Sequence, residues 1–301
     1  MCNKETEQII IDLILLGSYM NYTPAQLESM GVISIEESSK TGNGTVSLKR
    51  YTCSEEIKDV VIPRKINNKL VTEIGAMAFL AGDMNEIDET KSINSVIIPS
   101  SITGIGMAAF YGNKLTSVTI PNSVQTIGAF AFESNNLTSV ELGDSLTSIG
   151  YLAFGFNQLT NVTLPNSVTE IGEAAFYQNK LTSLTLGNSV QTIRDSAFES
   201  NNLTSVTIPN SVQTIGNNAF LYNNLTSVTI GSGITSIGSR AFHNGTFTDS
   251  KTGITWGPNA LENVYINRNS SDVEIRSSAF GWASGYNTTD NLHWNSTGPT
   301  G

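Results

Sequence analysis

The stretch Leu203–Asn224, LTSVTIPNSVQTIGNNAFLYNN, recurs through the middle of the chain with a period of 22 residues. Its Ala-Phe pair marks the period, and the phenylalanines that close successive copies are Phe110, Phe132, Phe154, Phe176, Phe198, Phe220 and Phe242. A fixed period of this length is typical of a solenoid, in which each repeat packs only against its neighbours. The sequence therefore predicts a stack of coils and not a closed globular core.

Each copy contains two segments with strand character. In LTSVTI the apolar residues alternate with polar ones, which predicts a half-buried strand that the following Pro or Gly ends. The segment SVQTIG predicts a second, shorter extended piece. We expect the Ala-Phe pair to occupy an irregular or helical turn, with its phenylalanine in the core.

Nine copies can be counted. Phe79 and Phe280 add two Ala-Phe pairs to the seven above. The strand motif Leu-x-x-Val-x-Ile starts at Ile57, Ile93, Leu115, Leu137, Leu159, Leu181, Leu203, Leu225 and Leu261. Extra residues interrupt the period at 64–70, 82–91 and 246–259. We therefore predict a repeat domain over residues 45–280.

The two ends depart from the repeat. In residues 1–44 we expect a helical cap, with Thr6–Tyr19 as an apolar helix that shields the first coil or, alternatively, binds a partner. Residues 281–301 are interpreted as a C-terminal cap and linker, in which Trp282 covers the last coil or serves as a ligand platform. Cys2 is an ordinary free cysteine or, alternatively, the lipidated first residue of a mature lipoprotein.

An asparagine recurs two residues before the leucine that opens each strand. We expect these side chains to form a buried ladder that bonds the backbone of successive coils, although a turn also favours Asn for its own conformation. The series comprises Asn113, Asn135, Asn157, Asn179, Asn201 and Asn223.

Composition excludes several function classes. The net charge is −10 without a basic stripe, which argues against nucleic acid and anionic membrane as partners. The two cysteines and two histidines leave little for metal binding or catalysis, and no apolar run is long enough to span a bilayer. The acidic run Asp83–Glu89 lacks the glycine of a calcium loop and has Ile87 at a ligand position, so it reads as a solvated loop. We predict neither catalytic residues, nor a metal site, nor a cofactor.

The repeated pattern Leu-x-x-Val-x-Ile-Pro-x-x-Val-x-x-Ile-Gly-x-x-Ala-Phe-x-x-Asn resembles the BspA-like, treponemal-class leucine-rich repeat of bacterial surface proteins. The resemblance covers about residues 44–280. It implies a right-handed solenoid with a parallel sheet along its concave face. It also implies a secreted or surface-attached protein that acts by binding, with no catalytic residues.

On that sheet the third and fifth residues of each strand motif would point outward. Hydroxyl groups dominate the centre, and apolar or aromatic groups lie at the ends. The partner-binding residues predicted from this arrangement are Asp59, Val61, Ile97, Thr119, Glu141, Thr163, Thr185, Thr207, Thr229 and Tyr265.

Three functions fit the pattern. The first is adhesion, through binding of host or neighbouring-cell proteins. The second is glycan binding, which Asn, Ser, Thr and the C-terminal tryptophans Trp256, Trp282 and Trp294 favour. The third is ice binding through the Ser/Thr ranks, against which the interruptions at Glu141 and Asn161 argue.

Overall fold

A computed structural model gives the structure of the chain. It describes residues 58–66 and 68–242 in full, and the backbone of short strands at 21–22, 32–37, 46–51, 247–248, 255–256, 264–269 and 272–277. The chain divides into two compact units, Met1–Leu159 and Thr160–Gly301. Each unit is described by itself.

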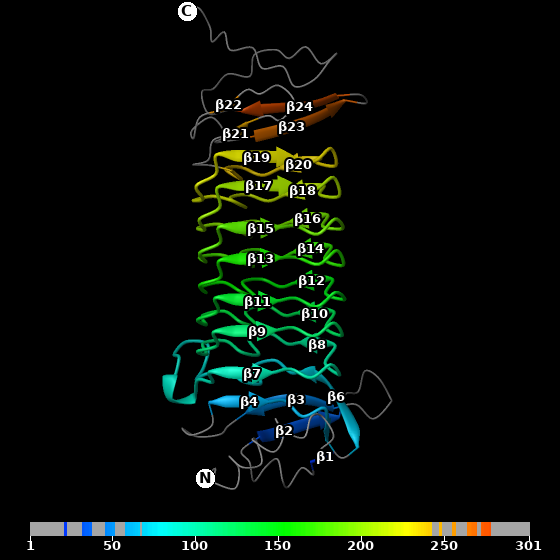
Figure 1. Ribbon diagram of the computed structural model, residues 1–301, viewed down its shortest axis with the longest axis vertical. Helices are drawn as coiled ribbons and strands as arrows, with labels where there is room; N and C mark the ends of the chain where they lie inside the picture. The colour runs from blue at the N-terminus through cyan, green and yellow to red at the C-terminus, as the bar shows by residue number, and fades with distance from the viewer. Residues whose placement is uncertain are drawn as a thin grey trace, which may run out of the picture. The chain divides into compact units, whose positions relative to one another are not determined.

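Unit 1 is a stack of coils, each with two short strands (Figure 1). The first strands of the coils are β4 (Asp59–Val61), β7 (Ser95–Ile97), β9 (Ser117–Thr119) and β11 (Ser139–Glu141). The second strands, β6 (Lys69–Ile74), β8 (Gly104–Ile105), β10 (Thr126–Ile127) and β12 (Ser148–Ile149), pair in parallel. From Ser95 onward the coils follow one another every 22 residues.

Further strands surround the first coil of unit 1. The antiparallel pair β2 (Val32–Glu37) and β3 (Val46–Tyr51) joins the sheet because β3 pairs in parallel with β6. The extra residues near 64–70 form a hairpin of β5 (Lys65–Ile66) with β6, and β1 (Asn21–Tyr22) pairs with β5. The acidic insertion contains a single 3-10 turn, η1 (Glu89–Lys91).

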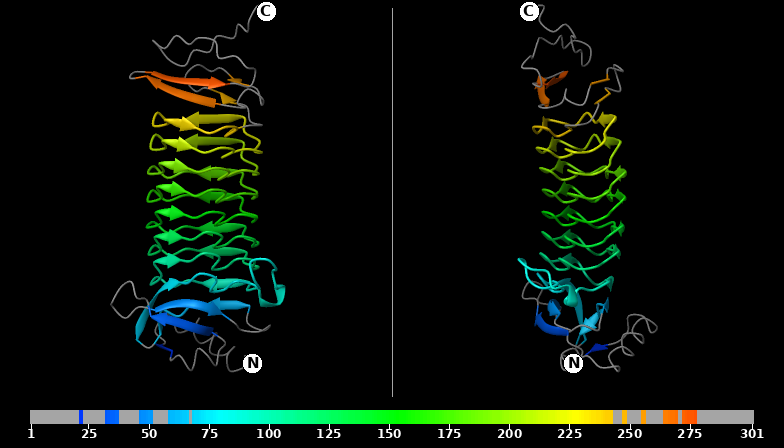
Figure 2. Two further views of the ribbon diagram at one scale, coloured as in Figure 1. Left: turned by 180° about the vertical axis from the view of Figure 1, so that it is seen from behind. Right: turned by 90° about the vertical axis from the view of Figure 1, so that its left-hand side faces the viewer.

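Unit 2 repeats the same coil. Its first strands are β13 (Asn161–Thr163), β15 (Ser183–Thr185), β17 (Ser205–Ile208) and β19 (Ser227–Ile230). Its second strands are β14 (Glu170–Ile171), β16 (Thr192–Ile193), β18 (Thr214–Ile215) and β20 (Ser236–Ile237), again parallel. Two hairpins follow, β21 (Phe247–Thr248) with β22 (Thr255–Trp256), and β23 (Val264–Asn269) with β24 (Asp272–Ser277). Figure 2 shows the coils of each unit from behind and from the side.

A column of stacked phenylalanines runs through the core of each unit, together with buried Leu, Val, Ile and Ala side chains. In unit 1 the rings of Phe79, Phe110, Phe132 and Phe154 follow one another with centroids 5.1, 5.1 and 5.3 Å apart. In unit 2 the rings from Phe176 to Phe242 are spaced by 5.2–5.4 Å. The Ala-Phe turn is irregular, and the described residues contain no α-helix.

The predicted asparagine ladder is confirmed. Asn135 is 5% exposed, and its Nδ2 donates to the Phe110 carbonyl of the preceding coil at 2.8 Å. Its Oδ1 accepts from the Leu115 N–H at 3.1 Å. Because the same bonds recur at Asn157, Asn201 and Asn223, each side chain fastens one turn to the coil before it.

The predicted mainly-β repeat solenoid with parallel sheets is confirmed in each unit. One expectation needs correction. The segment predicted as the ninth repeat contains the antiparallel hairpin β23–β24, whereas the first strands of the described preceding coils pair in parallel. The spacing of apolar residues did not distinguish a hairpin strand from a repeat strand, because both alternate apolar and polar residues. The predicted helix Thr6–Tyr19 and Trp282 lie outside the described residues.

Candidate functional site

The candidate binding surface in both units is the strand face, which we define as the outward side of the first strands. Alternate residues of these strands point outward, so that β9 has Ser117 and Thr119 exposed and Val118 buried. The face can therefore be described residue by residue within each unit.

In unit 1 the strand face has an apolar pair at one end. Val61 lies opposite Ile97 in the parallel pair β4–β7, and the Ile97 side chain is 52% exposed. Beside them the Ser95 hydroxyl donates to the Asp59 carboxylate at 2.6 Å. Three of the predicted binding residues, Asp59, Val61 and Ile97, are thus adjacent.

The next strand pair of unit 1 is polar. Thr119 lies opposite Glu141 on β9 and β11, and the threonine hydroxyl donates to Glu141 Oε2 at 3.1 Å. Both residues are exposed. This pair can accept and donate hydrogen bonds but offers no apolar anchor.

In unit 2 the strand face carries two ranks of small polar side chains. Thr163 lies opposite Thr185, and Thr207 opposite Thr229, and all four are exposed. Asn161, Ser183, Ser205 and Ser227 form the second rank. The remaining predicted residue, Tyr265, lies on β23 opposite Arg276 of an antiparallel strand, so it does not continue the parallel ranks.

The first strands associate as doublets. Among the described strands of unit 1, β4 bonds to β7 and β9 to β11, and in unit 2 β13 bonds to β15 and β17 to β19. In three of these doublets the strand of the first coil ends in Pro and that of the second in Gly: Pro121 and Gly143, Pro165 and Gly187, Pro209 and Gly231. In the doublet β4–β7 both strands are followed by proline, Pro63 and Pro99. The sequence therefore has a second period of 44 residues between Pro121 and Gly231, which a single repeat does not show.

Glycine allows the close approach within a doublet. A Cβ added to Gly187 would lie 2.3 Å from the Pro165 carbonyl oxygen, so only glycine fits there. The N–H of the following residue, Asn188, then donates to Asn166 Oδ1 at 2.9 Å. Proline carries a Cβ and would meet the same carbonyl oxygen, so the close approach seen at Gly187 is not open to it.

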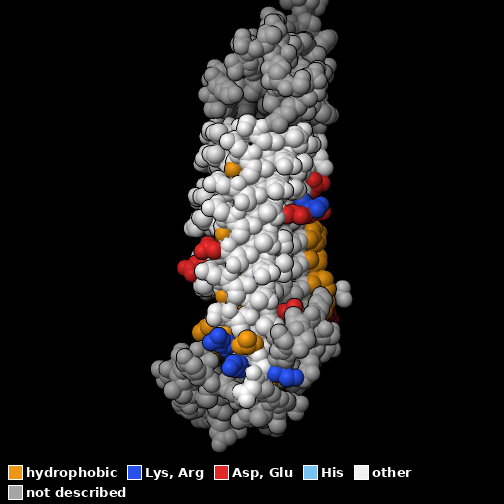
Figure 3. Space-filling view, turned by 90° about the vertical axis from the view of Figure 1, so that its right-hand side faces the viewer, with side chains coloured by type: hydrophobic (Ala, Val, Ile, Leu, Met, Phe, Trp, Pro, Cys, Tyr) orange, Lys and Arg blue, Asp and Glu red, His pale blue; other side chains and the backbone are white. Residues whose placement is uncertain are grey.

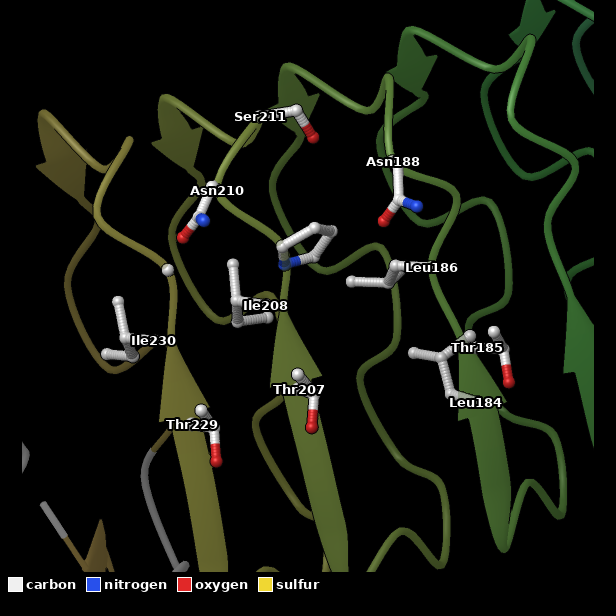
Figure 4. Close-up of a pocket in the computed structure, with 12 residues that line it drawn as sticks. Leu184, Thr185, Leu186, Asn188, Thr207, Ile208, Asn210, Ser211, Thr229 and Ile230 are labelled. Carbon is white, nitrogen blue, oxygen red and sulfur yellow. The ribbon is translucent and has the colours of Figure 1, made fainter. Parts of the chain in front are cut away.

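Where two doublets meet in unit 2, the surface is hollowed. A depression of about 650 Å³ lies at the ends of β15, β17 and β19 (Figure 4). Leu184, Leu186, Ile208 and Pro209 provide apolar walls, and Thr185, Thr207, Asn188 and Asn210 provide hydroxyl and amide groups. The depression is neutral, because all of its lining residues are uncharged.

The acidic insertion does not form a cation site in the described residues, where no group of three or more potential metal ligands occurs. Its carboxylates bind protein donors instead. Asp83 Oδ1 accepts from the N–H groups of Asn85 and Glu86 at 2.7 and 2.9 Å, and the side chains of Thr90 and Lys91 lower the pKa of Asp88 to about 2. These contacts fix the loop, and Lys114 joins it through Glu89 at 2.8 Å.

The repeats match a known family model. The model of the BspA type leucine-rich repeat region matches residues 44–157, 84–202 and 127–248. The chain belongs to this family. The matched ranges cover the described coils of both units.

Solved structures of leucine-rich repeat proteins are similar to this BspA-type chain. One is a leucine-rich repeat protein from Bacteroides ovatus, with 25% identity, a TM-score of 0.60, and coverage of 72% of this chain and 57% of that one. Another is a leucine-rich cell surface protein from Faecalibacterium prausnitzii, with 24% identity, a TM-score of 0.54, and coverage of 81% and 61%. The leucine-rich repeat protein of T. pallidum has 26% identity, a TM-score of 0.50, and coverage of 70% and 86%.

The BspA-type chain spans less than two thirds of the first two of these structures. No curated protein is detectably similar to it. In the part of the chain that the structure describes, no helix is both long and apolar enough to cross a membrane.

Proposed function

We propose that this chain is a non-enzymatic binding module of a bacterial surface or secreted protein, which binds proteins of a host or of neighbouring cells. Membership of the BspA-type repeat family supports a role in interaction. The low content of charged residues and the acidic net charge of −10 favour protein or neutral partners over nucleic acid.

The observation that carries this proposal is the apolar pair Val61 and Ile97 in unit 1. Ile97 is half-exposed on a strand whose other outward residue, Ser95, is polar. Binding energy at protein interfaces is concentrated in a few anchors with near-neutral polar surroundings. The pair has that arrangement, with Asp59 and Ser95 beside it.

The test is a binding assay of the full chain against a panel of extracellular-matrix proteins and glycans. The double variant V61S/I97S is expected to lower affinity for a captured protein at least tenfold, because it removes the apolar anchor. Ser117→Ala, on the same face, is the matched control and should leave the affinity unchanged. Binding that survives V61S/I97S would contradict the placement of the site, and turnover of a substrate would contradict the proposal as a whole.

A glycan is the second candidate ligand, and the depression in unit 2 is the observation that favours it. Its amides and hydroxyls, Asn188, Asn210, Thr185 and Thr207, can bond sugar hydroxyls, and Leu186, Ile208 and Pro209 can contact the apolar side of a sugar ring. The double variant N188A/N210A should abolish glycan binding in the same panel if this candidate is correct. A glycan that binds this variant with unchanged affinity would contradict it.

A further inference from the structure

In the doublet β13–β15 of unit 2, two hydrogen bonds join the coils near the ends of the first strands. The Leu164 N–H donates to the Thr185 carbonyl at 2.9 Å. A few residues further on, the Asn188 N–H donates to Asn166 Oδ1 at 2.9 Å. Both bonds join equivalent parts of two successive coils, so the same two bonds are available at every step of the stack.

Between β15 and β17, where one doublet ends and the next begins, neither bond is formed among the described residues. The first would join the Leu186 N–H to the Thr207 carbonyl. The second would join the Asn210 N–H to Asn188 Oδ1. All four residues line the depression at the ends of these strands. Two donors and two acceptors therefore remain available to a ligand there.

The interruption is confined to the first strands. The second strands of the same coils, β16 and β18, pair in parallel register. In the core the Phe176 and Phe198 rings stack 5.4 Å apart, close to the 5.2 Å of the following steps. An added peptide strand needs ~4.7–4.9 Å on each of its two sides, so it cannot enter between these coils. The ligand must meet the strand ends from the surface.

Polar groups left unpaired at this place point to a ligand. Backbone N–H and C=O groups that are removed from water nearly always have a hydrogen-bond partner. Leu186 is only 7% exposed. Ser211, which also lines the depression, has a buried hydroxyl oxygen without a partner in the described part of the chain.

We propose that the depression binds the acetamido group of an N-acetylated sugar in a neutral glycan. This ligand is one class of the glycans that form the second candidate function, and it rests on that candidate. An acetamido group joins a carbonyl acceptor, an N–H donor and a methyl group. Its carbonyl can accept from the Leu186 N–H and its N–H can donate to the Thr207 carbonyl, in place of the bond that the two strands lack.

The remaining groups of the depression suit the rest of the sugar. Figure 4 shows the Leu186 side chain pointing toward Ile208, so the two residues offer an apolar surface to the acetamido methyl group. Ring hydroxyls can donate to Asn188 Oδ1 and accept from the Asn210 N–H. A plain hexose provides the hydroxyls but neither the methyl group nor the amide.

Size and charge restrict the glycan further. The volume of about 650 Å³ lies within the ~300–1,000 Å³ of small-ligand sites. None of the lining residues is charged, so a sugar carboxylate or a free amino group would lose its hydration without a counter-charge. Figure 3 shows that uncharged side chains and backbone cover most of the described coils on the face seen there. An uncharged N-acetylated sugar is therefore favoured over an acidic or a basic one.

Two trisaccharides test the acetamido contact on the full chain. Tri-N-acetylchitotriose and cellotriose have the same linkage, and they differ in having an acetamido group or a hydroxyl on each ring. Calorimetric titration should show at least tenfold tighter binding of the N-acetylated trimer, because only this trimer supplies the amide and the methyl group.

Hydrogen exchange of single amides, followed by NMR, reports on the contact itself. In the free chain the Leu186 N–H should exchange faster than the Leu164 N–H, which is bonded to the Thr185 carbonyl. Saturation with the N-acetylated trimer should slow exchange at Leu186 at least fivefold and leave exchange at Leu164 unchanged. Cellotriose should slow neither.

Leu186→Pro removes the proposed donor. The Leu186 N–H bonds to no described residue and follows the last residue of β15, so this variant should stay folded. It should weaken binding of the N-acetylated trimer about tenfold, the effect of one lost hydrogen bond, and leave cellotriose binding unchanged. Leu164→Pro is the matched control, which should lower the Tm because it breaks the bond to Thr185.

Equal affinities for the two trimers, or unchanged exchange at Leu186 on saturation, would overturn the acetamido contact. The glycan candidate would still stand in that case if N188A/N210A abolishes binding of both trimers. If neither trimer binds, the acetamido contact is also wrong, and the wider glycan panel decides the second candidate by itself. V61S/I97S, which changes residues of unit 1, should bind the N-acetylated trimer as the parent does, so this result is independent of the protein-binding proposal.

Discussion

At the scale of single residues, Glu133 is a buried carboxyl whose Oε2 has no hydrogen-bond partner. Burial raises the pKa of Glu133 from its ordinary 4.5 to about 7, because the charged form loses its hydration. Between these two values the folded protein retains a proton that the unfolded chain has released. Glu133 therefore makes the folded protein progressively less stable as pH rises from 4.5 to 7. Above pH 7 the full destabilisation by the buried carboxylate is present.

Glu133→Gln is accordingly expected to raise the free energy of unfolding at pH 8 by about 1–3 kcal/mol and to lose this advantage below pH ~4.5. Urea denaturation at a series of pH values measures the difference. Glu199→Gln, at the equivalent but only half-buried position of unit 2, controls for loss of a charge as such. An equal gain from Glu133→Gln at pH 4 and pH 8 would contradict the burial argument.

A second prediction at this scale concerns the asparagine ladder. Asn157 donates to the carbonyls of Phe132, Phe154 and Gly155 and accepts from the Leu137 N–H at 3.0 Å. Asn157→Leu leaves these buried groups unpaired, and it should lower the free energy of unfolding by about 2–4 kcal/mol. Asn136, which follows the ladder residue Asn135, is exposed. Asn136→Leu should therefore change the free energy of unfolding by less than about 0.5 kcal/mol. Equal denaturation midpoints for the two variants would rule out a stabilising ladder.

At the scale of elements, the doublets β9–β11, β13–β15 and β17–β19 depend on the glycine that follows their second strand. Gly187→Ala would place a Cβ 2.3 Å from the Pro165 carbonyl oxygen, and it is expected to cost about 2–3 kcal/mol through displaced backbone. A Cβ at Gly104 meets nothing closer than Thr126 Oγ1 at 3.5 Å. Gly104→Ala should thus be neutral or stabilise by up to about 1 kcal/mol. Thermal unfolding compares the two, and a neutral Gly187→Ala would show that the coils do not need the close approach.

At the scale of the whole molecule, the 44-residue period predicts which deletions the chain tolerates. Deletion of residues 182–225 removes 44 residues from unit 2 and leaves the coil of Pro165 followed by that of Gly231, so one doublet is restored. Deletion of residues 182–203 removes only 22, but it places Pro209 after Pro165 and leaves β13 without its partner. Because repeat stability depends on the interfaces between neighbours, the longer deletion should have the higher Tm. A higher Tm for the shorter deletion would show that single coils, and not doublets, are the unit of stability.

The sequence by itself determined the repeat and its chemistry. Alternation in LTSVTI predicted first strands with Val118 inward and Thr119 outward, the Ala-Phe period predicted the phenylalanine column, and the recurring Asn predicted the ladder. These features depend on local pattern and on contacts between identical positions of adjacent coils. The strand-face residues of each unit could be named for the same reason.

Only the tertiary structure decided how the β23–β24 segment pairs and which turn side chains are exposed. Both features depend on contacts between residues that differ from coil to coil. The antiparallel hairpin β23–β24 has the same apolar alternation as a repeat strand, and only its pairing partner distinguishes the two. The exposure of Met77, Met107 and Tyr151 likewise follows from turn backbone that directs them outward, while Ala108 beside them is fully buried. The repeat pattern leaves these turn positions free, so only the stacked coils show which of their side chains are exposed.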